Sequence, residues 1–130
     1  MLDLNLYTWK KLADIAITNH RDEYCDFAVP TLEEKGVYIL VIDDKVVYIG
    51  KTNNFNNRWN NGYCKAGLHS NKPSTNERIN HAILIATFEG KPIELWWCKT
   101  NDMDELEEQL IRTHEPKLNI EFTSRDRRNV

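Results

Sequence analysis

A glutamate lies on the apolar face of a helix predicted near the end of the chain. The run D-M-D-E-L-E-E-Q-L-I-R-T-H covers residues 102–114, and its apolar stripe consists of Met103, Leu106, Leu110 and Ile111. Glu107 falls inside this stripe, whereas Glu105 and Glu108 point away from it. A carboxylate on a core-facing side is costly unless it is paired or bound to a metal ion. Glu107 is therefore either a partner in a structural ion pair or a metal ligand.

Arg58 has a comparable position beside an aromatic pair. Phe55 and Trp59 are four residues apart and should pack together on a short helix, with Arg58 on or next to the same face. An arginine in this position can cover apolar surface with its stem and leave its head in water. Its guanidinium group can also make a forked contact with a phosphate. The residue types alone leave both interpretations open.

Two tyrosines and a lysine stand on a predicted β-hairpin. Tyr38 ends the sequence G-V-Y on the first strand, and Tyr48 begins the sequence Y-I-G on the second. Tyrosines on strands usually serve packing within the sheet. Lys51 follows Gly50 at the end of the second strand, where a turn of the backbone leaves room for a ligand. The hairpin can therefore be plain structure or one side of an active site.

The periodicity of the chain predicts the elements that position these residues. They are a helix at 8–20, strands at 36–42 and 46–50, a short helix at 53–60, a helix at 74–88, a strand at 92–99 and a helix at 102–114. The first helix rests on one apolar face made of Trp9, Leu12, Ala13, Ala16 and Ile17. The irregular stretch 61–73 is long enough to suggest a functional or mobile loop. This order predicts an α+β fold with a short central three-stranded antiparallel sheet flanked by helices.

The whole chain of 130 residues suits one domain, with an N-terminal helical extension at 1–35, a core at 36–119 and a tail at 120–130. No signal peptide or membrane-spanning run is visible, so a cytoplasmic location without membrane contact is expected. The net charge is −3. Residues 51–91 nevertheless carry six basic and two acidic side chains, and residues 102–108 are strongly acidic. A basic surface of this kind can follow phosphates while a carboxylate holds a metal ion.

Taken together, these positions resemble a known family. Gly36-Val37-Tyr38, Tyr48-Ile49-Gly50-Lys51, Arg58, Glu107 and Asn119 resemble the motifs of the GIY-YIG nuclease domain. The first triplet reads G-V-Y instead of G-I-Y, and the resemblance covers roughly residues 36–119. The combination is specific to the family, whereas either triplet alone would not be.

The resemblance implies roles for the matching residues. Glu107 would hold one Mg²⁺ or Mn²⁺ ion, and Arg58 would brace the phosphate as negative charge develops. Tyr38 or Tyr48 would help a water molecule attack, and Lys51 belongs to the same catalytic set. A tyrosine has a pKa near 10 and needs a nearby cation to act as a base at neutral pH. Asn119 would hydrogen-bond the sheet and fix the helix of Glu107, an architectural role.

The expected function is a metal-dependent DNA endonuclease of the restriction type, or one from a phage or mobile element. The alternative is a non-catalytic nucleic-acid-binding module with the same fold. Contacts with DNA are expected from the 61–73 loop and the helix that follows it, through Lys72, Asn76, Arg78 and His81. Cutting both strands with one active site per chain favours a homodimer, with the 8–20 helix packed on the core or at the interface.

Overall fold

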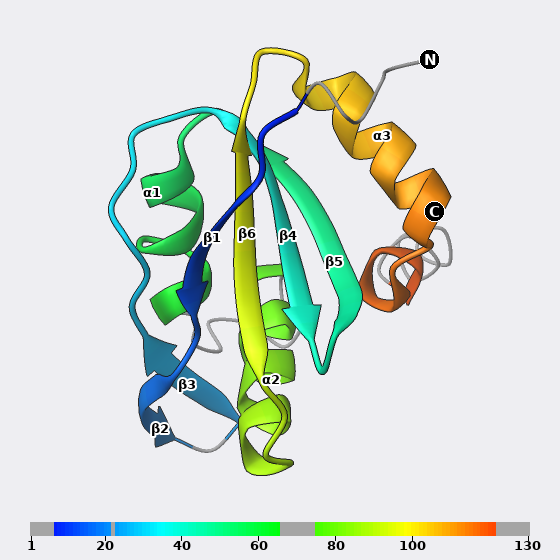
Figure 1. Ribbon diagram of the computed structural model, residues 1–130. Coiled ribbons are helices and arrows are strands. Elements are labelled where there is room, and N and C mark those ends of the chain that lie inside the picture. Colours follow the sequence, from blue (N-terminus) through cyan, green and yellow to red (C-terminus); the bar gives the residue numbers. More distant parts are fainter. Residues whose placement is uncertain (1–6, 22, 66–74, 122–130) are drawn as a thin grey trace, which may run out of the picture.

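A four-stranded antiparallel sheet forms the centre of the computed structural model, which describes residues 7–21, 23–65 and 75–121 (Figure 1). The strand order is β1-β6-β4-β5. These strands are β1 (Lys10–Asp14), β4 (Gly36–Ile42), β5 (Lys45–Thr52) and β6 (Ile93–Lys99). A separate two-stranded sheet contains β2 (Ile17–Arg21) and β3 (Tyr24–Phe27). The long central strands β4 and β6 are paired over seven residues each, which makes them the most enclosed part of the sheet.

The helices agree with their predicted positions after residue 50. They are α1 (Phe55–Trp59), α2 (Thr75–Phe88) and α3 (Met103–His114), with a 3-10 turn η2 (Tyr63–Lys65) and a further helical turn at 117–121. The predicted β4–β5 hairpin is also confirmed. Asp43 and Asp44 form its turn with φ angles of 53° and 63°, the left-handed conformation that a two-residue hairpin turn requires. Within the described residues, no helix is both long enough and apolar enough to cross a membrane.

The predicted helix at 8–20 is wrong, because this segment forms β1 and β2. β1 pairs with the edge of β6, and its register shifts between Lys11 and Ala13. Such a β-bulge breaks the strict two-residue alternation of a strand. The apolar residues of the segment therefore repeat at a spacing that imitates a helix. The edge of β6 is open without β1, and pairing with it satisfies a row of backbone groups that a helix would leave exposed. The sheet consequently has four strands instead of the predicted three.

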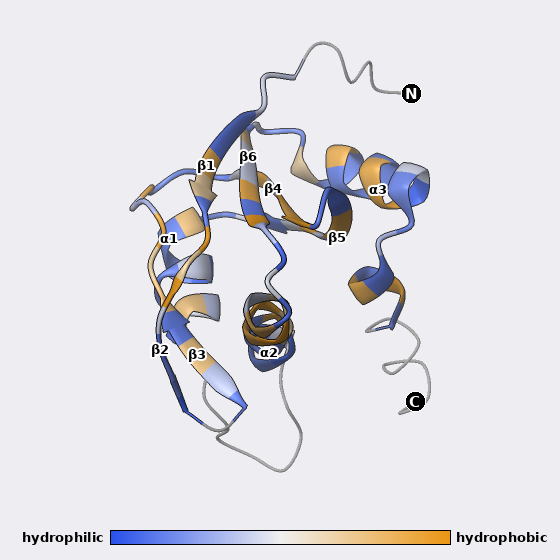
Figure 2. Cartoon of the chain, turned by 60° about the horizontal axis from the view of Figure 1, so that its bottom comes forward, coloured by the Kyte–Doolittle hydropathy of each residue, from blue (hydrophilic) through white to orange (hydrophobic). Residues whose placement is uncertain are grey.

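The sheet separates two hydrophobic clusters, because alternate side chains of each strand point to opposite faces. Tyr38 and Leu40 of β4 belong to the cluster that α1 and α2 cover. Val37 of β4 and Ile49 of β5 belong to the cluster that α3 covers through Leu106 and Leu110. Figures 1 and 2 show α2 and α3 on opposite sides of the sheet. Residues that are neighbours on one strand thus serve different faces.

Gly36 provides a test of how tightly β4 approaches β6. A Cβ atom at Gly36 would lie 2.1 Å from the carbonyl oxygen of Cys98, which is backbone and cannot rotate away. Gly36→Ala should therefore lower the free energy of unfolding by about 3 kcal/mol. Urea denaturation followed by circular dichroism measures this change.

Gly90→Ala is the matched control. Gly90 has a φ of 72°, and a Cβ there would meet nothing within 4 Å. Its replacement costs only the left-handed backbone conformation, about 1 to 2 kcal/mol. A Gly36→Ala protein as stable as the Gly90→Ala protein would contradict the close approach of the two strands.

Candidate active site

The predicted catalytic residues gather around the free edge of β5. This strand ends the order β1-β6-β4-β5, so one of its sides has no strand partner among the described residues. Tyr48 lies on the face of the sheet that α1 and α2 cover, while Lys51 lies on the opposite face of the sheet, near α3. Arg58 comes from the last turn of α1, and Glu107 comes from α3. The structure therefore brings together residues that stand up to 59 positions apart in the chain.

Tyr38 is the buried centre of this site. It stands opposite Gly50 in the β4–β5 register and has no exposed surface. A Cβ atom at Gly50 would lie 2.2 Å from the Tyr38 hydroxyl, so the tyrosine side chain lies directly over this residue. The glycine of Y-I-G is thus required by the tyrosine of G-V-Y across the hairpin.

A hydrogen-bond network connects Tyr38 with two residues outside the sheet. Its hydroxyl oxygen lies 2.5 Å from the hydroxyl oxygen of Tyr63, which is also buried. The Nε of Arg58 donates a hydrogen bond to the Tyr38 hydroxyl at 3.3 Å. The Arg58 guanidinium carbon lies 5.1 Å from the centre of the Tyr63 ring, a cation–π distance. The guanidinium group is therefore held by two tyrosines and remains half-buried.

Tyr63 is a site residue that the sequence analysis missed, because it fell in the irregular stretch 61–73. The available signal was its spacing, since Phe55, Trp59 and Tyr63 follow one another at intervals of four. In the structure the ring centres of Phe55 and Trp59 are 6.2 Å apart, and those of Trp59 and Tyr63 are 4.5 Å apart. This aromatic row continues the apolar face of α1 into η2.

The tyrosines of the site hold their protons strongly. Burial, followed by the neighbouring Tyr48, raises the pKa of Tyr38 to about 12, although the Arg58 charge opposes the change. Burial also raises the pKa of Tyr48 and that of Tyr63, again against the positive charge of Arg58. All three phenols are therefore neutral hydrogen-bonding groups near pH 7.

Glu107 occupies the boundary position that its helical face predicts. It is half-buried beside the buried Leu106, whereas Glu105 and Glu108 are exposed. Burial raises the pKa of the Glu107 carboxyl, although the Lys51 charge and a hydrogen bond from the Lys51 backbone amide lower it. The effect of desolvation on the pKa thus exceeds that of the nearby positive charges. The loss of hydration of the ionised carboxylate is only partly offset by its neighbours.

The ammonium group of Lys51 forms an ion pair with Asp104, one helical turn before Glu107 on α3. Asp104 had no predicted role. This contact raises the pKa of Lys51, first through the hydrogen bond with Asp104. Lys51 therefore stays charged, and its side chain is directed to α3 next to Glu107.

Asn119 closes part of the free edge of β5. Its side-chain oxygen accepts a hydrogen bond from the Ile49 amide, and its nitrogen donates to the Ile49 carbonyl, both at 2.8 Å. The expected hydrogen bonding of Asn119 with the sheet is therefore present. It ties the 117–121 turn, which follows α3, to the strand that carries Tyr48.

The residues predicted to contact DNA are spread along α2. Asn76 lies at the start of the helix near the backbone that leads into η2, since its Nδ2 lies 3.2 Å from the position of a Cβ on Gly62. Arg78, two residues further on, is half-buried. His81 is directed elsewhere, because its Nδ1 donates to the Glu23 carbonyl at 2.8 Å. Lys72 lies outside the described residues.

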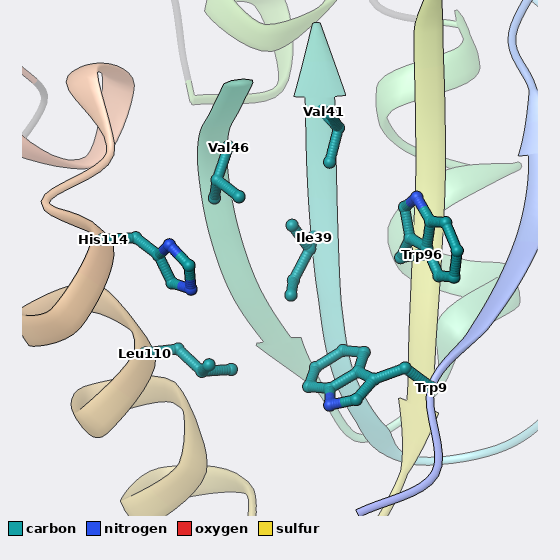
Figure 3. Close-up of a pocket in the computed structure, with 7 residues that line it drawn as sticks. All are labelled: Trp9, Ile39, Val41, Val46, Trp96, Leu110 and His114. Atoms are coloured by element: carbon teal, nitrogen blue, oxygen red, sulfur yellow. The ribbon is translucent and has the colours of Figure 1, made fainter. Parts of the chain in front are cut away.

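A cavity of about 380 Å³ lies on the α3 face of the sheet, separate from these residues (Figure 3). Its lining consists of Trp9, Ile39, Val41, Val46, Trp96, Leu110 and His114. This lining is apolar apart from the indole nitrogens and His114, and it includes none of the predicted site residues. The cavity is therefore not where the candidate chemistry lies.

Comparisons with known proteins agree with the predicted resemblance. The family model of the GIY-YIG catalytic domain matches residues 34–119, a segment that contains every predicted catalytic residue. A solved structure of a mutant of EndoII from bacteriophage T4 has a TM-score of 0.67 and 20% sequence identity, and the match covers 87% of this chain and 92% of that chain. This likeness shows a shared fold. No curated protein sequence matches the chain.

The high pKa of Tyr38 predicts a loss of stability at alkaline pH. The folded protein retains the Tyr38 proton up to a pKa of about 12, whereas the unfolded chain releases it near 10. The stability due to this group is complete below about pH 10 and is lost as the pH rises to about 12, in total about 3 kcal/mol. Tyr38→Phe should therefore lose stability less steeply over this interval than the wild type.

Urea denaturation at a series of pH values from 8 to 12 measures both slopes. The variant starts from a lower stability because it lacks the hydroxyl contacts, so the comparison concerns the slope and not the absolute value. Parallel curves for the two proteins above pH 10 would contradict the protected state of Tyr38.

Proposed function

Because the chain belongs to the GIY-YIG family of endonuclease catalytic domains, we propose that it is a divalent-metal-dependent enzyme that hydrolyses phosphodiester bonds in DNA. The observation that carries the proposal is the gathering of Arg58, Tyr48 and Glu107 at one strand edge. The positive charge of Arg58 acts on both Tyr48 and Glu107, so the three groups share one electrostatic environment. A cation, a phenol and a carboxylate in one place suit a phosphate substrate.

Glu107 fits the role of metal ligand. Its carboxyl is half-buried and its ionised form is disfavoured by burial, so a bound cation would relieve this cost. The described residues contain no cluster of three or more His, Cys, Asp or Glu side chains able to hold a metal. A single carboxylate suits Mg²⁺ or Mn²⁺, which keep several water ligands and take oxygen atoms from the substrate. When bound, the ion would neutralise charge on the phosphate and the leaving oxygen.

Arg58 would stabilise the phosphate as its negative charge increases. Its Nε is engaged by the Tyr38 hydroxyl, and its guanidinium plane lies near the Tyr63 ring. These contacts fix the direction of the side chain before substrate binds, so little reorganisation is needed during the reaction. The terminal nitrogens of the guanidinium group would then make the forked contact with two phosphate oxygens.

Tyr48 is better suited than Tyr38 to orient the attacking water. Tyr38 has no exposed surface, whereas Tyr48 is half-buried and also interacts with Tyr63 and Arg58 through hydrogen bonds. We assign Tyr38 to holding Arg58 in place and Tyr48 to the contact with water. To take a proton from the attacking water, Tyr48 must first lose its own, which requires a lower pKa of its phenol. Further positive charge at the site would lower this pKa.

Lys51 and Asn119 support this arrangement. The Lys51 amide donates to Glu107, and its ammonium group adds positive charge on the α3 face. Asn119 holds β5 in place through its two hydrogen bonds with the backbone of Ile49. Both residues therefore act on the geometry and charge around Glu107.

The site would receive DNA along the start of α2. Asn76 lies beside Gly62, the residue before Tyr63, and Arg78 adds a positive charge to the same helix. His81, held by the Glu23 carbonyl, would contribute less than the sequence pattern indicates. We propose that the enzyme is of the restriction type or serves a phage or mobile element, and that two copies act together to cut both strands.

Removal of the Glu107 carboxylate should abolish cleavage. Glu107→Ala and Arg58→Ala should each lower the cleavage rate on supercoiled plasmid by at least about 100-fold, because each removes charge stabilisation of the transition state. The assay is run with Mg²⁺, Mn²⁺ or EDTA, and EDTA should stop the wild-type reaction. Circular dichroism checks that both variants remain folded.

Glu108→Ala is the matched control for this experiment. Glu108 is the next residue on α3, but it is exposed and pairs with Arg112 at 2.7 Å. Its removal should leave the rate unchanged. Full activity of Glu107→Ala would overturn the assignment, and an inactive, well-folded wild type under every metal would favour a non-catalytic binding module. Discrete fragments support the restriction type, whereas random nicks exclude it.

Arg78 should contribute to DNA binding through a phosphate. Arg78→Ala should weaken binding and reduce the slope of log affinity against log salt by about 1. Fluorescence anisotropy with a labelled duplex at several salt concentrations measures this slope. Lys91→Ala is the control, because Lys91 lies beyond the opposite end of α2 and pairs with Glu89. Equal slopes for the wild type and Arg78→Ala would remove this part of α2 from the DNA surface.

A further inference from the structure

Asn80 is a fully buried polar residue in the middle of α2. Its side-chain oxygen accepts a hydrogen bond from the Cys25 amide at 2.8 Å. Its side-chain nitrogen donates to the Cys25 carbonyl at 2.8 Å and to the Tyr63 carbonyl at 2.7 Å. One amide group therefore joins three segments, namely α2, β3 and η2, and both of its amide hydrogens are used.

Asparagine is an unusual residue for this position in the core. Its neighbours Ile79, Ile83 and Leu84 are buried and apolar, and asparagine is a poor helix former. An apolar residue would suit the helix better, but it would leave buried backbone groups of Cys25 and Tyr63 without these partners. Each such loss costs about 1 to 3 kcal/mol. The hydrogen bonds of Asn80 therefore account for its presence in the core.

Tyr63 is held at both ends. Its carbonyl is bound by Asn80, and its hydroxyl is bound by Tyr38. Between them, its ring contacts Trp59 and lies under the guanidinium group of Arg58. The η2 turn comprises only three residues, so its own helical hydrogen bonds are few and its position depends on such outside contacts.

We propose that Asn80 is a positioning residue for cleavage, which acts by fixing η2 so that Tyr63 and Tyr38 hold Arg58 toward the phosphate. This inference rests on the proposed nuclease function. Within the part of the chain that the structure describes, the side-chain hydrogen bonds of Asn80 go to the backbone of Cys25 and Tyr63. Its replacement should let η2 shift, and a displacement of about 1 Å in a positioning group can lower a rate by about 100-fold.

A double-mutant cycle tests the route through Tyr63. The four proteins are the wild type, Asn80→Ala, Tyr63→Phe and the double variant, and the measured quantity is the single-turnover cleavage rate at saturating DNA. Asn80→Ala should reduce this rate by about 10- to 100-fold while DNA affinity stays unchanged. In the Tyr63→Phe background the same replacement should have a much smaller effect. Independent, multiplicative effects would overturn the proposal.

Ile93→Ala is the control for general destabilisation. Ile93 is buried in the same hydrophobic cluster but lies at the far end of β6, opposite Ile42 near the hairpin turn. Its truncation costs about 2 to 5 kcal/mol through a cavity and should leave the single-turnover rate unchanged below the unfolding temperature. If Ile93→Ala slows cleavage as much as Asn80→Ala, the role of Asn80 is only structural. Asn80→Asp, which keeps the acceptor for the Cys25 amide and removes both donors, replaces Asn80→Ala if that variant is unfolded.

A readout independent of activity separates this inference from the proposed function. The ring centre of Trp59 lies 4.5 Å from that of Tyr63, so the ring current of the tryptophan should displace the Tyr63 resonances in a ring-labelled NMR sample. Asn80→Ala should move these resonances toward their values in an unfolded chain, whereas Ile93→Ala should not. If the wild type fails to cleave DNA, the nuclease proposal fails while this shift still reports the positioning. Unmoved Tyr63 resonances in Asn80→Ala would overturn the inference.

Discussion

The need to satisfy one buried hydroxyl organises the active site. Tyr38 has no exposed surface, and a phenol buried without a hydrogen-bond partner would destabilise the fold. Its partners are Tyr63 and Arg58, which come from the segment that follows the hairpin. The side chain fits between them because Gly50 leaves room beneath it. A requirement of the core thus places an arginine head group and two phenols within one network, and the proposed chemistry uses the same groups.

Side chains from outside the sheet bind the backbone of β5 at its free edge. An unpaired strand edge normally invites association with another chain. Here the backbone of Ile49 is bound by Asn119, and the amide of Lys51 is bound by Glu107. Glu107 therefore has a structural contact that holds its carboxylate at the edge, in addition to its proposed role with the metal ion. The opposite edge of the sheet is closed differently, since β1 pairs with β6.

The two faces of the sheet have different roles. The face of α1 and α2 contains the tyrosine network, and Asn80 connects this network to the core of α2. The face of α3 contains the apolar cavity between Trp9 and His114, which lies apart from the predicted site. The acidic side chains Asp104 and Glu107 lie on α3, where Lys51 pairs with Asp104, whereas Arg58 approaches from α1. The proposed metal ligand and the phosphate-binding arginine thus approach β5 from opposite faces.

The sequence alone determined the β4–β5 hairpin and the helices α2 and α3, because these elements rest on local periodicity. Its short motifs also predicted Tyr38, Tyr48, Arg58 and Glu107 as site residues. It failed at residues 8–20, where a bulge in β1 imitates helical spacing. The first part of this segment is a strand because it pairs with the open edge of β6. Asp104 and Asn80 could not be chosen from their neighbours in the chain, and for Tyr63 the sequence signal was only its spacing from Phe55 and Trp59. Their roles come from contacts with residues between 17 and 55 positions away, which exist only when the sheet and its helices have packed.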